Sequence, residues 1–289
     1  MNDLVEVHTH PTLHEPVLVV ALEGWIDAGM AAAGAMRAML EHLDTELVAT
    51  FDTDALLDHR ARRPVMQLIA GHVNELVWPA IELRGAVDAN GRHVLFLVGS
   101  EPDHLWGSFC GSVIELALDL EVSTIIGLGA YPAPVPHTRP THLALTSPSQ
   151  DLLDSHVGFF RGSVEVPAGV QAAIEVAAYD AGIPALGVWA QVPHYIAATN
   201  YPAASLALVD GLTRVAGLVI DTPSLASDAA ATRLKLDELV AGNPQHEEMV
   251  QQLEVAADSF VDEAGLLGPI PTADELEAEL QRFLREQGE

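Results

Sequence analysis

Short apolar runs alternate with longer amphipathic stretches along the first part of the chain. The segment EPVLVVALE (15–23) is almost continuously apolar, which is typical of a strand buried on both faces of a sheet. The stretch 27–43 that follows is rich in Ala, Met and Leu, and it predicts a helix with Asp27 as N-cap. The dipeptide Asn90-Gly91 predicts a tight hairpin turn that leads into another strand.

This alternation predicts the fold class. We expect further strands at 46–52, 64–71, 75–87, 93–100, 123–130, 141–147 and 184–192. We expect further helices at 103–121, 169–182 and 203–219. Strands that alternate with amphipathic helices favour an α/β core domain over residues 1–220, built as a three-layer α/β/α sandwich around a mostly parallel, partly mixed sheet.

The pattern changes after residue 220. Two helices are expected around a break at Gly242-Asn243-Pro244, and a last helix is expected after Thr272, where Glu275 completes a capping box. This region, 221–289, contains sixteen acidic and four basic residues, a net charge of −12. The sequence therefore predicts an acidic C-terminal helical region, which favours a basic partner surface over an acidic one.

The net charge of the chain limits the kinds of molecule that it is expected to bind. The 289 residues include 13 basic and 41 acidic side chains, for a net charge of −28. Such a chain is repelled by phosphate backbones and anionic lipid surfaces, so we expect no nucleic acid and no membrane as partners. The longest apolar runs fall short of the ~18 residues of a membrane span, and the acidic start of the chain lacks the features of a secretory signal. With one cysteine, Cys110, the chain is expected to be cytoplasmic.

The chain has a single lysine, Lys235, which limits the enzyme classes to which it could belong. The sequence contains no Gly-Lys-Ser/Thr triplet of a P-loop, no H-E-x-x-H and no G-x-S-x-G motif. The His-x-His pair in EVHTHP (6–11) is similar to a metal-binding motif of amidohydrolases, but the further ligands and the lysine of that chemistry are missing. We therefore expect no metal, no cofactor and no motif-defined catalytic residue.

Candidate ligand-binding residues follow the first predicted strand, in EGWIDAG (23–29). Gly24 and Gly29 would let an anionic group approach the backbone at a helix N-terminus, and Asp27 could bind a hydroxyl or a cation. The alternative is that Asp27 only caps its helix and that the glycines only allow the turn.

A second loop, GSEPDHLWGSF (99–109), has the same strand-to-helix pattern. It brings Glu101 and Asp103 to the end of a central strand, and either could take part in ligand binding. The alternative is a capped helix start that is exposed to solvent.

Two proline-rich loops supply the remaining candidates. His137 and Arg139 lie in AYPAPVPHTRP (130–140), and His194 lies in a second Val-Pro-His tripeptide. Prolines would hold these side chains in fixed positions, and Arg139 could contact an anion or form an ion pair between subunits. The alternative for either histidine is a loop side chain bonded to the backbone.

We expect these loops to emerge at one edge of the sheet, because each begins where an apolar strand ends. Their residues would then form one cleft that contains Asp27, Asp103, His137, Arg139 and His194. The segment DHRARRP (58–64) is a basic island in an acidic chain, and it could bind either a phosphate or an acidic neighbouring subunit.

Six segments together resemble a bacterial branch of the proteasome assembly chaperone family, over about residues 4–220. They are ALEGWIDAG, FDTDALLDHRARRPVMQL, WPAIEL, LVGSEPDHLW, GLGAYPAPVPHTRP and VPHYIAATNYP. The resemblance implies a fold similar to that of nucleoside phosphorylases and self-association. Other branches dock on the proteasome core through a C-terminal hydrophobic-Tyr-X tail, whereas this sequence ends in LREQGE, so docking of that kind is not expected.

Two functional hypotheses follow. The favoured one is a cytoplasmic, non-catalytic assembly or scaffold protein that forms a homo-oligomer, such as a trimer or hexamer, and binds proteasome components. The alternative is a small-molecule enzyme of the nucleoside phosphorylase or hydrolase type. In that enzyme Arg139 would hold an anion, Asp27 or Asp103 a ribose hydroxyl, and His137 or His194 would transfer a proton.

Overall fold

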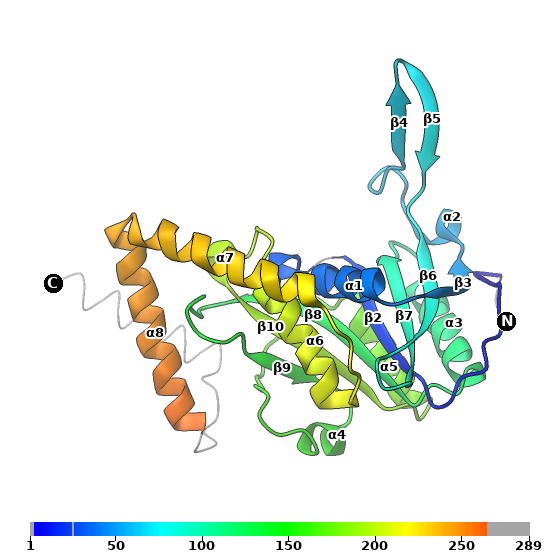
Figure 1. The fold of residues 1–289 in the computed structure, drawn as a ribbon. Helices are drawn as coiled ribbons and strands as arrows, with labels where there is room; N and C mark the ends of the chain where they lie inside the picture. Colours follow the sequence, from blue (N-terminus) through cyan, green and yellow to red (C-terminus); the bar gives the residue numbers. More distant parts are fainter. Residues whose placement is uncertain (1–2, 25, 265–289) are drawn as a thin grey trace.

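An eight-stranded mixed sheet forms the centre of the molecule (Figure 1). The computed structural model describes residues 3–24 and 26–264. In the order of the sheet, the strands are β1 (Val5–Val7), β3 (Glu46–Phe51), β6 (Ile81–Val87), β7 (His93–Ser100), β2 (Val17–Glu23), β8 (Thr124–Ala133), β10 (Ala185–Pro193) and β9 (Leu143–Thr146).

The strand directions confirm the mostly parallel, partly mixed sheet. The neighbours β7, β2, β8 and β10 pair in parallel. The outer pairs, β1 with β3, β3 with β6, β6 with β7 and β9 with β10, are antiparallel. Five of the eight strands, including β3, therefore point the same way.

Helices cover both faces of the sheet, which confirms the three-layer α/β arrangement. On one face lie α1 (Ala31–His42) and α6 (Pro202–Ala216), and on the other lie α3 (Trp106–Asp119) and α5 (Val170–Asp180). Strand β2 contributes Val17 and Val19 to the first core and Leu18 and Val20 to the second. Alternate residues of a strand face opposite sides of its sheet, so a strand buried on both faces must be continuously apolar. The closer likeness to nucleoside phosphorylases stays a prediction.

Short helical segments and two long helices complete the chain. The short ones are η1 (Ala28–Met30), α2 (Thr53–Leu56), α4 (Gln150–Asp154) and η2 (His194–Ile196). The long ones, α7 (Pro223–Ala241) and α8 (Pro244–Ala264), are separated at the expected break, and α7 packs on α6. The helix expected after Thr272 lies outside the described residues. Among the described helices, none is both long and apolar enough to cross a membrane.

One prediction about the sheet is wrong in part. The segments 64–71 and 75–87 are predicted as strands on a more exposed part of the sheet, and β6, which lies within the second segment, does belong to the main sheet. However, β4 (Val65–Ile69) and β5 (His72–Val77) pair only with each other and project from the body as a hairpin (Figure 1). Ala70 and Gly71 both have positive φ, which is the conformation of a two-residue hairpin turn, so the chain reverses directly and β4 pairs with β5.

A carboxylate is buried between α5 and the sheet. The side chain of Glu175 points into this layer, and the residue is 4% exposed. The Thr146 hydroxyl donates to its Oε2 at 3.0 Å, and the Gln171 amide donates to its Oε1 at 3.3 Å. These neutral donors only partly offset desolvation, so burial raises the pKa of Glu175 to about 7.

Replacing this carboxyl by a neutral amide, Glu175→Gln, should stabilise the protein at high pH. The pKa in the folded state lies above the ordinary value of 4.5, so the folded protein binds more protons between pH 4.5 and about 7, and its stability falls as the pH rises through that window. At about pH 8 the variant should be more stable than the wild type by about 1–3 kcal/mol, and near pH 4.5 the two should be alike. Urea denaturation across this pH range measures the difference.

The matched control is Asp180→Asn, which removes an exposed carboxylate from the end of the same helix. It should keep the pH slope of the wild type. An identical slope in wild type and Glu175→Gln would contradict the proposed cost of ionising Glu175.

Candidate functional site

The four candidate loops leave the sheet at one edge, as expected. They follow the carboxyl ends of β2, β7, β8 and β10, which lie side by side and point the same way. Contacts join the loops: the Glu101 amide donates to the Glu23 carbonyl at 2.8 Å, and Asp27 forms a β-bridge with Ala130. Residues far apart in sequence therefore meet along this edge.

The side chain of Asp27 binds backbone amides. Its Oδ1 accepts from the amide of Ala32 at 2.8 Å and its Oδ2 accepts from that of Ala33 at 3.0 Å, at the N-terminus of α1. Burial raises the pKa of Asp27, and these amide hydrogen bonds act against the rise. The carboxylate thus satisfies amides that the first turn of a helix leaves without partners, which is the capping alternative.

Gly29 lets the first loop approach the segment between β10 and α6. It has a φ of 66°, its amide donates to the Ala197 carbonyl at 2.7 Å, and its carbonyl accepts from the Tyr201 amide at 2.8 Å. A Cβ atom here would lie 2.9 Å from the Tyr201 side chain. Both the backbone conformation and the close approach therefore require glycine.

Glu101 lies against Gly24 and caps a different helix. The residue is nearly buried, and its Oε1 accepts from the Val170 amide at 2.6 Å, at the start of α5. A Cβ on Gly24 would lie 2.2 Å from Oε2 of Glu101, so the glycine makes room for this carboxylate. These two residues are in direct contact, across two strand ends.

Asp103 turns away from the other candidates. Its Oδ2 accepts from the Asp58 amide at 2.8 Å, and its Oδ1 lies 3.5 Å from a guanidinium nitrogen of Arg62. It therefore holds the basic island that precedes the hairpin. His194 is exposed, and its ring packs edge-on against Tyr195 at 5.4 Å between centroids.

The two Val-Pro-His loops meet through His137 and Tyr195. The His137 amide donates to the Tyr195 hydroxyl oxygen at 2.8 Å, and the same oxygen lies 2.6 Å from Nδ1 of the His137 ring. The Tyr195 hydroxyl therefore contacts both the backbone and the ring of His137. Burial raises the pKa of Tyr195 to about 12, which keeps the hydroxyl protonated.

The other side of the His137 ring faces α7. Its side chain is fully buried, and Nε2 lies 3.3 Å from Oδ1 of Asp237, a close approach without hydrogen-bond geometry. Arg233 donates to the His137 carbonyl at 2.9 Å and pairs with Asp237 one helical turn along. Burial and the Arg233 charge lower the pKa of His137, and they outweigh the opposite effect of Asp237. The ring is therefore neutral at physiological pH.

Arg139 binds α8. Its guanidinium forms a two-pronged ion pair with Asp258, in which both N–O distances are 2.7 Å, and a third bond to Glu254 at 3.1 Å. The Thr138 hydroxyl also donates to Glu254. The hydrogen bonds that Arg139 donates to Asp258, followed by the charges of both carboxylates, raise the pKa of the Arg139 guanidinium. The anion bound to Arg139 is thus part of the same chain.

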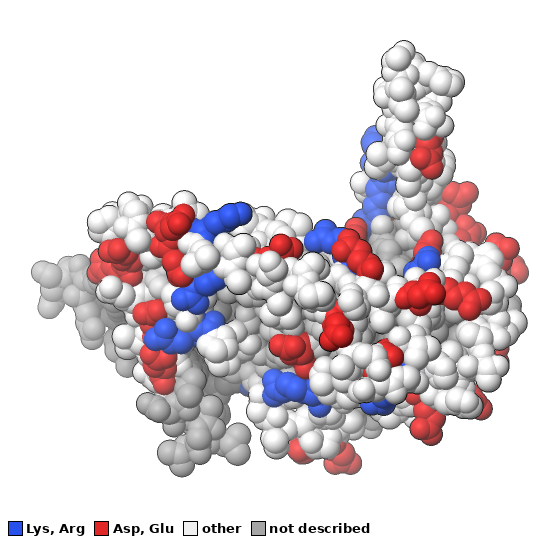
Figure 2. Space-filling view, viewed as in Figure 1, with Lys and Arg blue, Asp and Glu red and all other residues white. Residues whose placement is uncertain are grey.

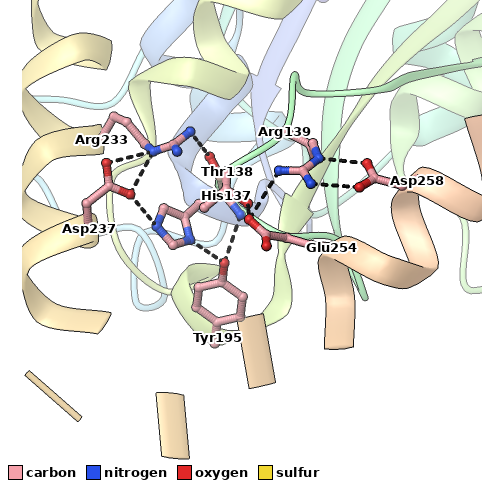
Figure 3. A network of polar contacts seen from close by, with 8 residues as sticks. All are labelled: His137, Thr138, Arg139, Tyr195, Arg233, Asp237, Glu254 and Asp258. Atoms are coloured by element: carbon pink, nitrogen blue, oxygen red, sulfur yellow. Dashed lines mark hydrogen bonds and ion pairs between the residues drawn. The ribbon is translucent and has the colours of Figure 1, made fainter. Parts of the chain in front are cut away.

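Together these contacts form one network, which we call the loop–helix network (Figure 3). Its members are His137, Thr138, Arg139, Tyr195, Arg233, Asp237, Glu254 and Asp258. It joins the loop after β8 and the segment η2 to both long helices. This geometry positions the loop tightly, and it engages Nδ1 of His137 and the guanidinium of Arg139 within the chain, whereas Nε2 of His137 has no hydrogen-bond partner among the described residues.

The prediction that these side chains line one shared cleft is therefore wrong. Asp27 binds the start of α1, Asp103 binds the segment before the hairpin, and Arg139 binds α8. The loops share an edge, but side chains on neighbouring loops can point to different layers. That any of these residues binds an external ligand stays a prediction. No group of three or more metal-binding side chains occurs within residues 3–24 and 26–264.

Sequence reasoning missed the four network members on the long helices, because it could not place those helices. A signal was nevertheless present. Arg233 with Asp237 and Glu254 with Asp258 are each spaced four residues apart, so each pair lies on one helix face and can act together.

Solved structures of three bacterial proteins are similar to the whole fold. A protein of unknown function from Mycobacterium tuberculosis is 35% identical, with a TM-score of 0.82 and 91% of each chain covered. One of unknown function from Corynebacterium glutamicum is 31% identical, with a TM-score of 0.85, covering 91% of this chain and 99% of its own. A proteasome-assembly chaperone homologue from Mycobacterium tuberculosis is 31% identical, with a TM-score of 0.74, covering 81% of this chain and 99% of its own.

Family membership rests on a match to a family model. No curated protein matches the chain. The model of the PAC2 family, however, matches residues 21–240, which include all four strand-end loops and nearly all of α7. The resemblance to proteasome assembly chaperones seen in the sequence is thereby confirmed, and the chain belongs to the PAC2 family.

Proposed function

We propose that the protein is a non-catalytic assembly or scaffold protein that acts on proteasome components in the cytoplasm. The observation that carries the proposal is the similarity to the mycobacterial proteasome-assembly chaperone homologue, which covers 81% of this chain and 99% of that protein. The internal engagement of Asp27, Glu101, His137 and Arg139 is consistent with a structural use of the strand-end loops. The phosphorylase or hydrolase alternative stays a hypothesis without a supporting observation.

Proteasome assembly can be followed directly. Purified α and β subunits of a bacterial proteasome would be mixed with or without the full chain, and the products separated on native gels over time. We expect the chain to bind subunits or half-assembled particles and to increase the amount of complete core particle. If the chain neither binds the subunits nor changes their assembly, the proposed function is contradicted.

We also propose that the chain self-associates through one face of the hairpin. The strand register pairs Met66 with Leu76 and Leu68 with Val73, so these four apolar side chains lie on the same face, which we call the hairpin face. All four are exposed, and an isolated two-stranded hairpin is only marginally stable in water. Burial against another copy would stabilise it.

Charge supports the hairpin as the place where copies meet. Residues 65–77 include one carboxylate, Glu75, and Figure 2 shows the outer part of the hairpin almost free of charged side chains. Copies that each carry a net charge of −28 repel one another, and the repulsion is smallest where the contact surfaces are uncharged.

Replacing two residues of the hairpin face, in Met66→Thr/Leu68→Thr, should shift the protein toward monomer. Threonine keeps the strand propensity but removes apolar area. Size-exclusion chromatography with light scattering should show an oligomer for the wild type and a smaller species for the variant. The control, Gln67→Thr/Ile69→Thr, changes the opposite face and should stay oligomeric. A monomeric wild type at micromolar concentration would refute self-association.

We further propose that residues 221–289 are a helical region held on the 1–220 core by the loop–helix network. The contacts of Arg139 with α8 and of Arg233 with the His137 carbonyl support this division of the chain.

Arg139→Ala should loosen α8 without unfolding the core. Loss of the two-pronged pair leaves Glu254 and Asp258 without their cation, so amides of α8 should exchange with solvent several-fold faster in hydrogen-exchange mass spectrometry, whereas those of β2 and β8 stay protected. Arg161→Ala, which removes the ion pair with Asp154 elsewhere on the surface, is the matched control and should leave α8 unchanged. Unaltered exchange of α8 in Arg139→Ala would argue against the proposed attachment.

A further inference from the structure

An acidic groove lies at the base of the hairpin, apart from the loop–helix network. Residues of the N-terminal strand β1, the end of β3, the start of α2 and the residue after β5 line it, and its volume is about 540 Å³. Its charged and aromatic lining residues are Asp3, Glu6, Asp52, Asp54, Phe51 and Trp78. Figure 2 shows acidic side chains gathered beside the hairpin base, on the side where Figure 1 places α2.

Four of the residues that line the groove are acidic: Asp3, Glu6, Asp52 and Asp54. None of its ten lining residues is basic. Oδ1 of Asp52 accepts from the amides of Asp54 and Ala55, at 3.0 and 3.3 Å. Asp54 lies 3.0 Å from a ring nitrogen of His59, and Glu6 lies 3.9 Å from one of His8. The side chains of Glu6 and Asp54 are 78% and 86% exposed, so both carboxylates can accept further donors.

An aromatic ring stands among these carboxylates. Trp78 is 51% exposed, and the His59 ring packs against it edge-to-face with 5.0 Å between the centroids. The ring of Phe51 is buried and adds an apolar surface to the lining. Tryptophan is the strongest cation–π acceptor among the side chains, and its face attracts a guanidinium or ammonium group whose stem covers apolar surface.

We propose that this groove binds a cationic segment of a partner protein, with an arginine or lysine side chain against Trp78 and between the carboxylates of Glu6, Asp52 and Asp54. Four separate elements line the groove, so it can accommodate several consecutive residues rather than one small ion. A second copy is a poor occupant because two chains of charge −28 repel, whereas a basic partner is attracted over a distance. The proposal rests on the proposed function and names the chemistry of its partner.

The test measures binding of a fluorescent peptide to the full chain by polarisation. The probe is a nine-residue peptide of alternating Arg and Ser, and the same peptide with Glu in place of Arg is the negative control. We expect saturable binding of the Arg peptide, weakening as salt increases, and a change in tryptophan fluorescence that is lost in Trp78→Phe. Absence of saturable binding would overturn the proposal.

Two variants of equal charge separate the groove from the general field of the protein. Glu6→Gln/Asp54→Asn removes two carboxylates from the groove, and it should weaken peptide binding about tenfold, because two charge-assisted contacts are lost. Asp119→Asn/Asp180→Asn removes two exposed carboxylates from α3 and α5, and it should change binding less than twofold. Equal weakening in both variants would show non-specific attraction and overturn the proposal.

The remaining outcomes are also decisive. Spermidine or free arginine that competes as well as the peptide would identify a small-cation site, and a groove variant that changes the oligomer but not peptide binding would identify a second copy as the occupant. Either result would overturn the proposal. Peptide binding that depends on the groove, together with no effect on proteasome assembly, would support the groove and refute only the proposed function.

Discussion

Burial of four parallel strands on both faces is the constraint on which the rest of the structure depends. Strands β7, β2, β8 and β10 can be buried only if helices cover each side, and parallel strands need connections that cross the sheet. Their carboxyl ends then meet at one edge. Every contact between the strand-end loops, including the meeting of His137 with Tyr195, follows from that arrangement.

At this edge, polar groups stabilise the chain by binding one another. Asp27 and Glu101 accept hydrogen bonds from amides at helix starts, and His137 links two loops and a helix through a neutral ring. Buried or half-buried polar groups need partners because the cost of leaving them unpaired is large. Arg139 is more exposed, but its charge is likewise paired within the chain, with carboxylates on α8.

Because the net charge of the chain is strongly negative, the two surfaces that we propose for binding suit different partners. Contact between identical copies is least unfavourable at the uncharged hairpin face, and contact with a basic partner is most favourable at the acidic groove. Both surfaces lie near the same hairpin, which forms a two-stranded sheet separate from the main one.

The sequence by itself determined the α/β class, the order of the main strands and helices, and the edge of the sheet where the loops emerge, because apolar periodicity reports burial and strand ends report direction. It could not separate the hairpin from the main sheet, since β4 and β6 both have strand-like sequences and only their pairing partners distinguish them. The partners of Asp27, Asp103 and Arg139 were likewise decided by the tertiary structure. The direction of a side chain depends on how segments more than a hundred residues apart pack together, as the contact between Arg139 and Asp258 shows. A local sequence pattern does not specify such a contact.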